Sequence, residues 1–326
     1  MRRLASIDVG TNTVLLSVVE HDPSDGADPG NPATFRVLAE RGAITRLGKN
    51  VSRTRRLDPD HTRATLDCLR GYRALLDELG VTELKVLGTS ALRDANGADL
   101  FLEEARTVLG VPLEVISGRR EAELTYQGAH VGLPLPPSGD RFVFDIGGGS
   151  TELIWGSGPR SVDHALSLNI GSVRLFEELK LSDPPTEEDL LRLEARIREL
   201  LDSAKLDPAL FAKSSLAIGV AGTVTSLSAI AHDEGRAELG AQNGKTLELR
   251  RAREVLQRLA KMSIKERTLI PCLGEGRADV IVCGAAIALA LMELIDAART
   301  DRSQPTSLVI SDRGVRYGAL LELASS

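Results

Sequence analysis

Short apolar runs and amphipathic stretches alternate along most of the chain. Runs rich in Leu, Val and Ile predict strands, at residues 4–9, 14–20, 35–46, 84–87, 113–116, 141–146, 151–155, 215–220 and 307–310. Apolar residues spaced three and four apart predict helices at 61–79, 99–109, 187–204, 248–262, 278–298 and 315–323. Thr186 and Asp189 form a capping signal before the third of these helices. Strands alternate with helices in the later part, which favours an α/β fold.

Several stretches depart from this pattern. Pro, Gly, Asp and Asn crowd residues 22–32, and Pro recurs in 133–139, so both segments are predicted to be loops. The longest apolar run, 280–295, is Ala-rich, contains Glu293 and is short for a membrane span, which indicates a buried helix. The N-terminus enters an apolar run without a charged-then-apolar leader. We therefore expect a cytoplasmic protein that does not bind a membrane.

Two segments 137 residues apart share one sequence pattern. In 8–15 and in 145–153, an apolar strand ends in an acid and a β-branched residue, a glycine-bearing polar turn follows, and a second strand begins. Such an internal repeat suggests a duplicated domain whose two hairpin turns face each other across a cleft. Because Asp-x-Gly turns are common, two unrelated turns remain the alternative.

Glycines and hydroxyls make these turns candidate phosphate sites, because a concave turn of successive N–H groups binds anions. The turn at 147–151 has three glycines and two hydroxyls; the candidate residues are Gly147, Gly148, Ser150 and Thr151. The turn at 10–13 offers Asn12 and Thr13. A third candidate, Gly222 and Thr223, follows a strand and opens a helix, although a plain strand–helix turn explains it equally well.

Acids next to the turns are candidate magnesium ligands, since a carboxylate beside bound phosphate is repelled unless a cation lies between them. Asp8, Asp145 and Glu152 have this position, and Mg²⁺ takes one or two carboxylates with waters and phosphate oxygens. Asp145 and Glu152 lie on the two strands of one hairpin, on either side of its turn, so both are expected at the same end of the hairpin. For Glu152 the alternative is a solvated strand residue.

Glu121 and Arg93 each follow a predicted strand. Arg93 is a candidate clamp for a phosphate oxygen. Glu121 lies where a helix begins, and there it suits a general base that orients water toward phosphorus. Spacing alone favours a plainer interpretation, in which its carboxylate complements the helix dipole.

Composition narrows the functional classes. The chain has 326 residues, enough for about two domains. Its formal net charge of −6 argues against a nucleic-acid coat protein. Residues 36–73 nevertheless hold ten Lys or Arg against four acids, which favours a local groove for a long anion, with a solvated helix face explaining part of the excess. The three cysteines lie far apart in the sequence and do not suggest a disulfide framework. The five histidines are also scattered and form no transition-metal motif.

Taken in order, six motifs resemble the exopolyphosphatase and guanosine pentaphosphate phosphohydrolase (Ppx/GppA) family, in its short two-domain form. They are 8–13, 89–93, 116–122, 145–153, Gly222-Thr223 and Ser311 with Gly314. The resemblance implies two actin-like α/β domains of the sugar kinase/Hsp70/actin superfold, which is ribonuclease H-like, flanking an active-site cleft. Domain I is expected at 1–125 with about 311–326, where the last helix returns, and domain II at 126–310.

The resemblance also implies roles. Glu121 becomes the catalytic base, and Asp145 and Glu152 hold Mg²⁺ and assist the water. The positions that match the family's phosphate loops are Asp8, Asn12, Thr13, Arg93, Gly147, Gly148, Ser150 and Thr151. Manganese as a substitute metal, and a monovalent cation such as K⁺, belong to the same expectation. Two departures stand out: Thr11 and Thr13 replace the usual serines, and Arg120 replaces the first of two adjacent glutamates.

The expected activity is Mg²⁺-assisted attack of water on inorganic polyphosphate, with release of terminal orthophosphate. A guanosine pentaphosphate (pppGpp) 5′-phosphohydrolase is the alternative with the same chemistry. An ATP-dependent kinase of the superfold and a non-catalytic alarmone-binding sensor remain open. The expected partners are the polyphosphate or pppGpp substrate and a second copy in a homodimer, with no nucleic acid.

Overall fold

The computed structural model describes residues 1–22, 35–234, 240–301 and 303–326, and it divides into two compact units. Unit 1 comprises Met1–Leu133 and Arg313–Ser326, and unit 2 comprises Pro134–Asp312. The boundary expected after residue 125 is therefore wrong by eight residues, because the helix that begins at Gly118 continues to Ala129 and packs within unit 1. The loop predicted at 22–32 lies outside the described residues except for Asp22.

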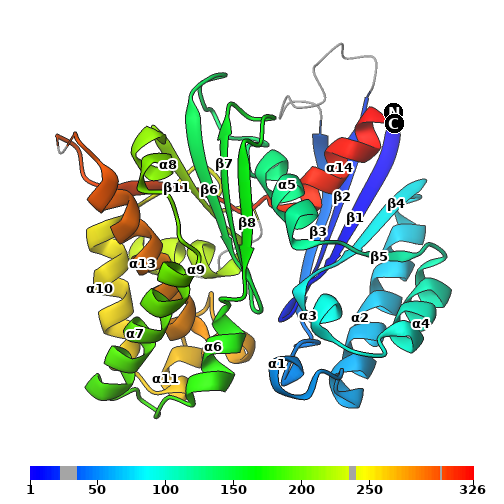
Figure 1. The fold of residues 1–326 in the computed structure, drawn as a ribbon. Coiled ribbons are helices and arrows are strands. Elements are labelled where there is room, and N and C mark those ends of the chain that lie inside the picture. Colours follow the sequence, from blue (N-terminus) through cyan, green and yellow to red (C-terminus); the bar gives the residue numbers. More distant parts are fainter. Residues whose placement is uncertain (23–34, 235–239, 302) are drawn as a thin grey trace. The chain divides into compact units, whose positions relative to one another are not determined.

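Unit 1 is built on a five-stranded sheet with the order β3-β2-β1-β4-β5. The strands are β1 (Arg2–Val9), β2 (Thr13–His21), β3 (Phe35–Ile44), β4 (Glu83–Gly88) and β5 (Leu113–Val115). β1, β2 and β3 are antiparallel, whereas β4 and β5 run parallel to β1. The helices are α1 (Val51–Thr54), α2 (Pro59–Glu78), α3 (Ser90–Asp94), α4 (Asp99–Leu109), α5 (Gly118–Ala129) and α14 (Val315–Ser325) (Figure 1).

The alternation of side chains along β1 decides which helices cover which face of this sheet. Ala5, Ile7 and Val9 belong to a core shared with α2 and α4. Leu4, on the opposite face, packs with residues of α14. Asp8 is on the Leu4 face, since it is an even number of residues away, so its side chain lies on the side that α14 covers.

Unit 2 is built on a six-stranded sheet with the order β10-β11-β9-β6-β7-β8. The strands are β6 (Asp140–Ile146), β7 (Thr151–Ser157), β8 (His164–Leu168), β9 (Leu216–Val220), β10 (Thr246–Glu248) and β11 (Ser307–Ser311). The helices are α6 (Ser172–Leu179), α7 (Glu187–Ser203), α8 (Pro208–Lys213), α9 (Ala221–Ala231), α10 (Leu249–Ala260), α11 (Ile264–Thr268), α12 (Gly274–Arg277) and α13 (Ile281–Ala298).

The two sheets repeat one topology, which confirms the duplicated α/β fold of the actin-like superfold. In each, a hairpin-connected antiparallel triplet continues into two parallel strands: β3-β2-β1-β4-β5 in unit 1 corresponds to β8-β7-β6-β9-β11 in unit 2. The sequence pattern shared by 8–15 and 145–153 therefore corresponds to two equivalent hairpins, β1–β2 and β6–β7.

The observed helices follow the predicted ones closely where apolar spacing is regular. The helix predicted at 99–109 is α4, and the capping signal at Thr186 and Asp189 is a complete capping box at the start of α7. The strand predicted to reach residue 46 stops at Ile44, because Arg46 has a φ of 56° and turns the chain. β8, α6, α8 and β10 were not predicted from the sequence; all are eight residues or shorter and too brief for a periodic signal.

Helix α13 contains the long apolar run and forms part of the core of unit 2. It is long and apolar enough to cross a membrane by composition alone, but 67% of its apolar window is buried inside the structure. Its residues pack against the sheet and the neighbouring helices of the same unit. The prediction of a buried helix is confirmed.

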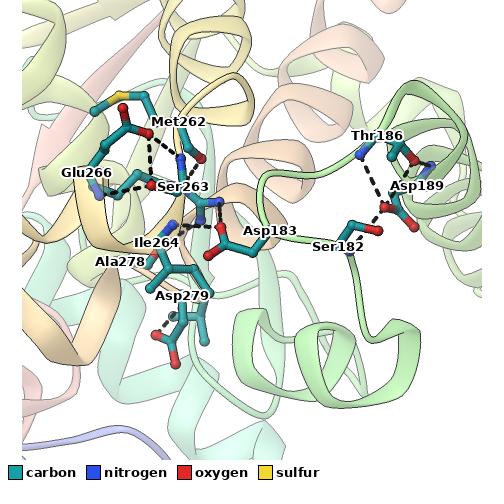
Figure 2. A network of polar contacts seen from close by, with 12 residues as sticks. Ser182, Asp183, Thr186, Asp189, Met262, Ser263, Ile264, Glu266, Ala278 and Asp279 are labelled. Carbon is teal, nitrogen blue, oxygen red and sulfur yellow. Dashed lines mark hydrogen bonds and ion pairs between the residues drawn. The ribbon is translucent and has the colours of Figure 1, made fainter.

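A polar network joins segments of unit 2 that are far apart in sequence (Figure 2). Asp183 accepts a hydrogen bond from the N–H of Ile264 at 2.7 Å, at the start of α11. The buried guanidinium of Arg267 donates to the carbonyl oxygen of Ala278 at 2.7 Å and lies 3.7 Å from Asp183. Backbone donation from Ser182 is the largest of the effects that lower the pKa of the nearby Asp189 to about 2. These bonds fix the loops that lead into α7 and α13.

Candidate functional site

The two hairpin turns have the same backbone geometry. Gly10 donates its N–H to the carbonyl oxygen of Thr13 at 3.0 Å, and Gly147 donates to that of Ser150 at 3.0 Å. In each hairpin an Asp is the last-but-one residue of the first strand: Asp8 in β1 and Asp145 in β6. The shared sequence pattern therefore reflects one local structure that occurs twice.

In unit 1, the carboxylate of Asp8 is held in an environment that disfavours its charge. Its Oδ1 is buried, and within the described residues no group donates a hydrogen bond to it. Burial, and next the charge of Glu121, raise the pKa of Asp8 to about 7, while the charge of Arg316 opposes the shift. A buried carboxylate oxygen without a donor is suited to accept a cation or to keep a proton.

Glu121 and Arg93 form an ion pair close to Asp8. Arg93 Nη1 lies 2.5 Å from Glu121 Oε2 and donates a second hydrogen bond to the carbonyl oxygen of Ile116 at 3.1 Å. Burial raises the pKa of Glu121, and the charge of Arg93 opposes that shift. Glu121 is only 8% exposed, so the helix-dipole interpretation, which concerns a solvated first-turn acid, describes it poorly.

The topology explains why these residues meet. α3, with Arg93, and α5, with Glu121, follow the parallel strands β4 and β5. The carboxyl ends of parallel strands meet at one edge of a sheet, and β1 ends there with Asp8. Residues from three separate segments therefore reach one place.

Helix α5 is fixed by very close contact with α14. A Cβ at Gly128 would lie 2.0 Å from the carbonyl oxygen of Gly314, and one at Gly318 would lie 2.2 Å from that of Leu124. Arg120 forms an ion pair with Glu322 of α14, which also binds Lys85 at 2.6 Å. The departure from the family pattern at Arg120 therefore links two helices of unit 1.

Arg316 lies beneath the same sheet face. It is 3% exposed, donates to Ser17 Oγ at 2.8 Å and lies 3.5 Å from Glu40. Its carbonyl oxygen accepts from Ser6 Oγ at 2.9 Å. Since Ser6 precedes Asp8 by two residues on the same face of β1, this network places a positive charge near Asp8.

In unit 2, three polar side chains form a row across the sheet. Asp145 is directly opposite Glu152, and Glu152 is directly opposite Ser167, whose Oγ donates to Glu152 Oε1 at 2.7 Å. Side chains in such a row share one face of the sheet. Glu152 is 1% exposed, so the alternative of a solvated strand residue is wrong.

The carboxylate pair of Asp145 and Glu152 fits a divalent cation. Two like charges directly opposite each other in a sheet are unfavourable, and a cation or a proton relieves that repulsion. Mg²⁺ needs only one or two carboxylates when phosphate oxygens and water supply its other ligands. Three or more His, Cys, Asp or Glu side chains do not gather at any point in the described ranges, so a closed all-protein metal cage is not present there.

The hydroxyl groups of the second turn differ in their availability. Thr151 is buried and donates to the carbonyl oxygen of Ile170 at 2.6 Å, so its proton is already used inside the fold. Ser150 is also buried, whereas Gly147 and Gly148 are partly exposed. The backbone of the two glycines is therefore the more accessible part of this turn.

The remaining predicted phosphate residues also have definite positions. Asn12 and Thr13 are partly exposed in the first turn. Thr223 is buried, with its Oγ1 donating to the carbonyl oxygen of Ile146 at 3.4 Å. Gly222 is partly exposed in the first turn of α9, a helix whose N-terminus has no side-chain cap.

Arg277, which lies against Gly222, was not among the site residues predicted from the sequence. A Cβ at Gly222 would be 3.1 Å from Arg277 Nη2 and 3.2 Å from its Cζ. The guanidinium makes a long hydrogen bond of 3.5 Å to Ser226 and no ion pair with any described residue, and burial lowers its pKa. A cation at the uncapped N-terminus of α9 favours an anion. Local sequence carries no signal for a contact between residues 55 positions apart.

Comparison with known proteins identifies relatives along almost the whole chain. Residues 18–326 match the Ppx/GppA phosphatase family. A Mycobacterium tuberculosis protein named Exopolyphosphatase 2 is 35% identical over 336 residues, covering 99% of each chain. A Vibrio vulnificus guanosine-5′-triphosphate,3′-diphosphate pyrophosphatase is 30% identical over 90% of this chain and 55% of that protein. The crystal structure of the Aquifex aeolicus Ppx/GppA family member is 31% identical, with a TM-score of 0.77 over 99% of this chain and 98% of that one.

Proposed function

The chain belongs to the Ppx/GppA phosphatase family, and we propose that it is an exopolyphosphatase that releases terminal orthophosphate from inorganic polyphosphate. The observation that carries this proposal is the buried Arg93–Glu121 ion pair beside Asp8, at the strand edge where the first glycine turn lies. It combines a cation for phosphate, a base for water and an oxygen suited to a metal.

In the proposed reaction, backbone N–H groups of the first glycine turn and the guanidinium of Arg93 bind the terminal phosphoryl group. Arg277 and the N-terminus of α9 add a further anion site in unit 2. Fixed donors of this kind stabilise charge on phosphoryl oxygens without reorganising during the reaction. The expectation that the two turns bind one substrate stays a prediction.

Glu121 is the proposed general base. Its carboxylate would orient the attacking water and accept its proton as the oxygen–phosphorus bond forms in line with the departing phosphate chain. The charge of Arg93 opposes the rise in the pKa of Glu121 and so favours its ionised form before substrate binds. When phosphoryl oxygens share the charge of Arg93, Glu121 becomes a stronger base, because the opposing effect on its raised pKa weakens.

The proposed cofactor is Mg²⁺, for which Asp145 and Glu152 in unit 2 and Asp8 in unit 1 are the candidate ligands, with Mn²⁺ as a substitute and K⁺ as an additional cation. The cross-strand pair and the donor-free Oδ1 of Asp8 support this assignment. When bound, the metal offsets negative charge on the phosphoryl oxygens. The three candidate carboxylates would set the position of the metal's positive charge.

Guanosine pentaphosphate is the second candidate substrate. The Vibrio vulnificus relative is named for guanosine-5′-triphosphate,3′-diphosphate, and it is 30% identical to this chain. The chemistry at the terminal phosphate would be the same, so the choice depends on the groups that bind the rest of the molecule. A cytoplasmic location and a homodimer complete the proposal; the free state of all three cysteines is consistent with a reducing compartment.

A phosphate-release panel tests the proposed function. The purified protein is given polyphosphates of several lengths, guanosine pentaphosphate and ATP, each with and without Mg²⁺. We expect Mg²⁺-dependent release of orthophosphate that is fastest from polyphosphate. Faster release from guanosine pentaphosphate would favour the second candidate, and tight alarmone binding without phosphate release would contradict both and favour a sensor.

A further inference from the structure

The segment between β3 and α2 lies directly against the first glycine turn. Arg46 donates its N–H to the carbonyl oxygen of Asn12 at 3.0 Å, and Gly48 donates to that of Thr11 at 2.8 Å. The approach is so close that a Cβ at Gly48 would lie 2.3 Å from Thr11 Cγ2. This segment, residues 46–56, is called the basic loop below.

The other side of the basic loop is attached to the helix that carries Arg93. Asn96 donates its N–H to the carbonyl oxygen of Arg55 at 2.7 Å, and the Arg55 guanidinium lies 3.6 Å from Asp94. Short helix α1, within the loop, contacts α3. The loop is therefore held between two parts of the proposed terminal-phosphate site, all within unit 1.

Three cations of the basic loop have no ion-pair partner among the described residues. Lys49, Arg53 and Arg56 are exposed, and none of their side chains forms an ion pair within the ranges that the structure describes. The nearby acids are engaged elsewhere: Asp58 caps α2 by accepting from two backbone N–H groups, and Asp94 faces Arg55.

The contrast with the neighbouring helix α2 makes this arrangement informative. Its exposed arginines are paired locally, Arg63 with Asp60 at 3.3 Å and Arg70 with Asp67 at 2.5 Å. Three like charges on one short loop repel each other; the charge of Lys49 helps to lower the pKa of Asp58, but no described carboxylate forms an ion pair with any of the three. The loop also holds Asn50 and Arg55 in left-handed backbone conformations, with φ of 61° and 55°, which non-glycine residues seldom adopt.

We propose that Lys49, Arg53 and Arg56 bind the internal phosphates of a polyphosphate chain whose terminal phosphate lies at the first glycine turn. This inference rests on the proposed function and adds a second subsite to it. Polyphosphate carries charge along its whole length, so a longer chain engages the loop while its end remains at Arg93. The loop then sets how strongly the enzyme prefers long chains to short ones.

Removing the three charges tests the subsite. The variant Lys49→Ala/Arg53→Ala/Arg56→Ala is compared with wild type on tripolyphosphate and on long-chain polyphosphate. We expect the ratio of kcat/KM for long chains to kcat/KM for tripolyphosphate to fall about tenfold or more, since local charge raises association rates of anions by about 10- to 1000-fold. Because both substrates are measured on one preparation, a partly unfolded sample does not change the ratio.

A matched control removes the same charge from unit 2. Arg198, Lys205 and Lys213 are exposed and form no ion pair with described residues. The triple Ala variant at these positions should keep the wild-type ratio. If the basic-loop triple does not fold, single Arg53→Ala and Arg56→Ala variants replace it, each with a smaller expected fall in the ratio.

The outcomes separate the two proposals. An unchanged ratio in the loop variant, or an equal fall in the control, would overturn the subsite while leaving the proposed function in place. No phosphate release by wild type from either chain would instead overturn the proposed function. A shallower dependence of long-chain kcat/KM on salt in the loop variant supports the subsite, since fewer ionic contacts are then made. Tighter binding of single-stranded RNA than of polyphosphate to the wild-type loop would contradict it.

Discussion

Arg93 and Glu121 lie on different helices, 28 residues apart in sequence, and their side chains meet at 2.5 Å. Each helix follows one of the parallel strands β4 and β5, so the pair exists because those strands end side by side. Arg93 was expected to bind phosphate and Glu121 to activate water. The ion pair adds a physical link between these roles, since whatever occupies Arg93 changes the basicity of Glu121.

The first prediction concerns Glu121 itself. Glu121→Gln keeps the shape of the side chain but cannot accept a proton from water. We expect kcat on polyphosphate to fall about 100-fold or more, as positioned bases contribute about 10²- to 10⁴-fold. Polyphosphate binding, measured by calorimetry, should persist. Turnover close to wild type would reject Glu121 as the base.

The second prediction concerns the partner of Glu121. Arg93→Ala leaves a largely buried carboxylate without its cation, so we expect a loss of stability of about 1–3 kcal/mol. The folded-state pKa of Glu121, already raised, should rise further. A raised carboxyl pKa means that the native state retains a proton that the unfolded chain releases, so the loss should grow as pH rises above the unfolded value.

Urea unfolding of Arg93→Ala between pH 4 and pH 8 checks this expectation. The double variant Arg93→Ala/Glu121→Gln is the control, because it removes the charge that was left unpaired. It should recover part of the stability at pH 8. A stability loss independent of pH in Arg93→Ala would show that the two charges are not coupled.

The third prediction follows from the raised pKa of Asp8, about 7 in the folded chain. Between the ordinary Asp value near 4 and pH 7, the native state holds a proton that the unfolded chain has lost. Without metal, wild-type stability should therefore decrease as pH rises through this window. Asp8→Asn should flatten the decrease and be the more stable protein at pH 8.

Thermal melting from pH 4 to pH 8, with and without Mg²⁺, tests this account of Asp8. Mg²⁺ should raise the melting temperature of wild type at pH 8 more than that of Asp8→Asn, because the amide gives up the charge that favours the cation. Equal effects of Mg²⁺ on both proteins would remove Asp8 from the proposed metal site.

The fourth prediction concerns the contact that fixes α5. At Gly128 an added Cβ would lie 2.0 Å from the carbonyl oxygen of Gly314, so α5 and α14 must move apart. Gly128→Ala should destabilise the protein by about 1–3 kcal/mol. It should also lower kcat, because Glu121 is on the same helix.

Gly71 on α2 provides the matched control for Gly128→Ala. A Cβ at Gly71 meets no other atom within 4 Å, so Gly71→Ala should stabilise the protein by about 0.5–1 kcal/mol. Chemical denaturation of both variants measures the difference. Equal effects at the two positions would show that the crossing of α5 and α14 is not tightly packed.

Much of the local structure was predictable because its causes are local. The spacing of apolar residues predicted α4 and α7, and the side chains of Thr186 and Asp189 predicted the start of α7. The repeat of acid, β-branched residue and glycine turn predicted a duplication, and the pattern occurs in two equivalent hairpins, β1–β2 and β6–β7. Short elements such as β8 and α6 were missed, because few residues carry little periodic information.

By itself, the sequence determined the fold class, the two glycine turns and the acids beside them, since each depends on residues a few positions apart. Only the tertiary structure decided that Arg93 pairs with Glu121, that Glu152 is buried, and that Arg277 lies against Gly222. The physical reason is that strand order and helix packing bring distant segments to one sheet edge. No local pattern of hydrophobicity or charge records which distant side chains meet there.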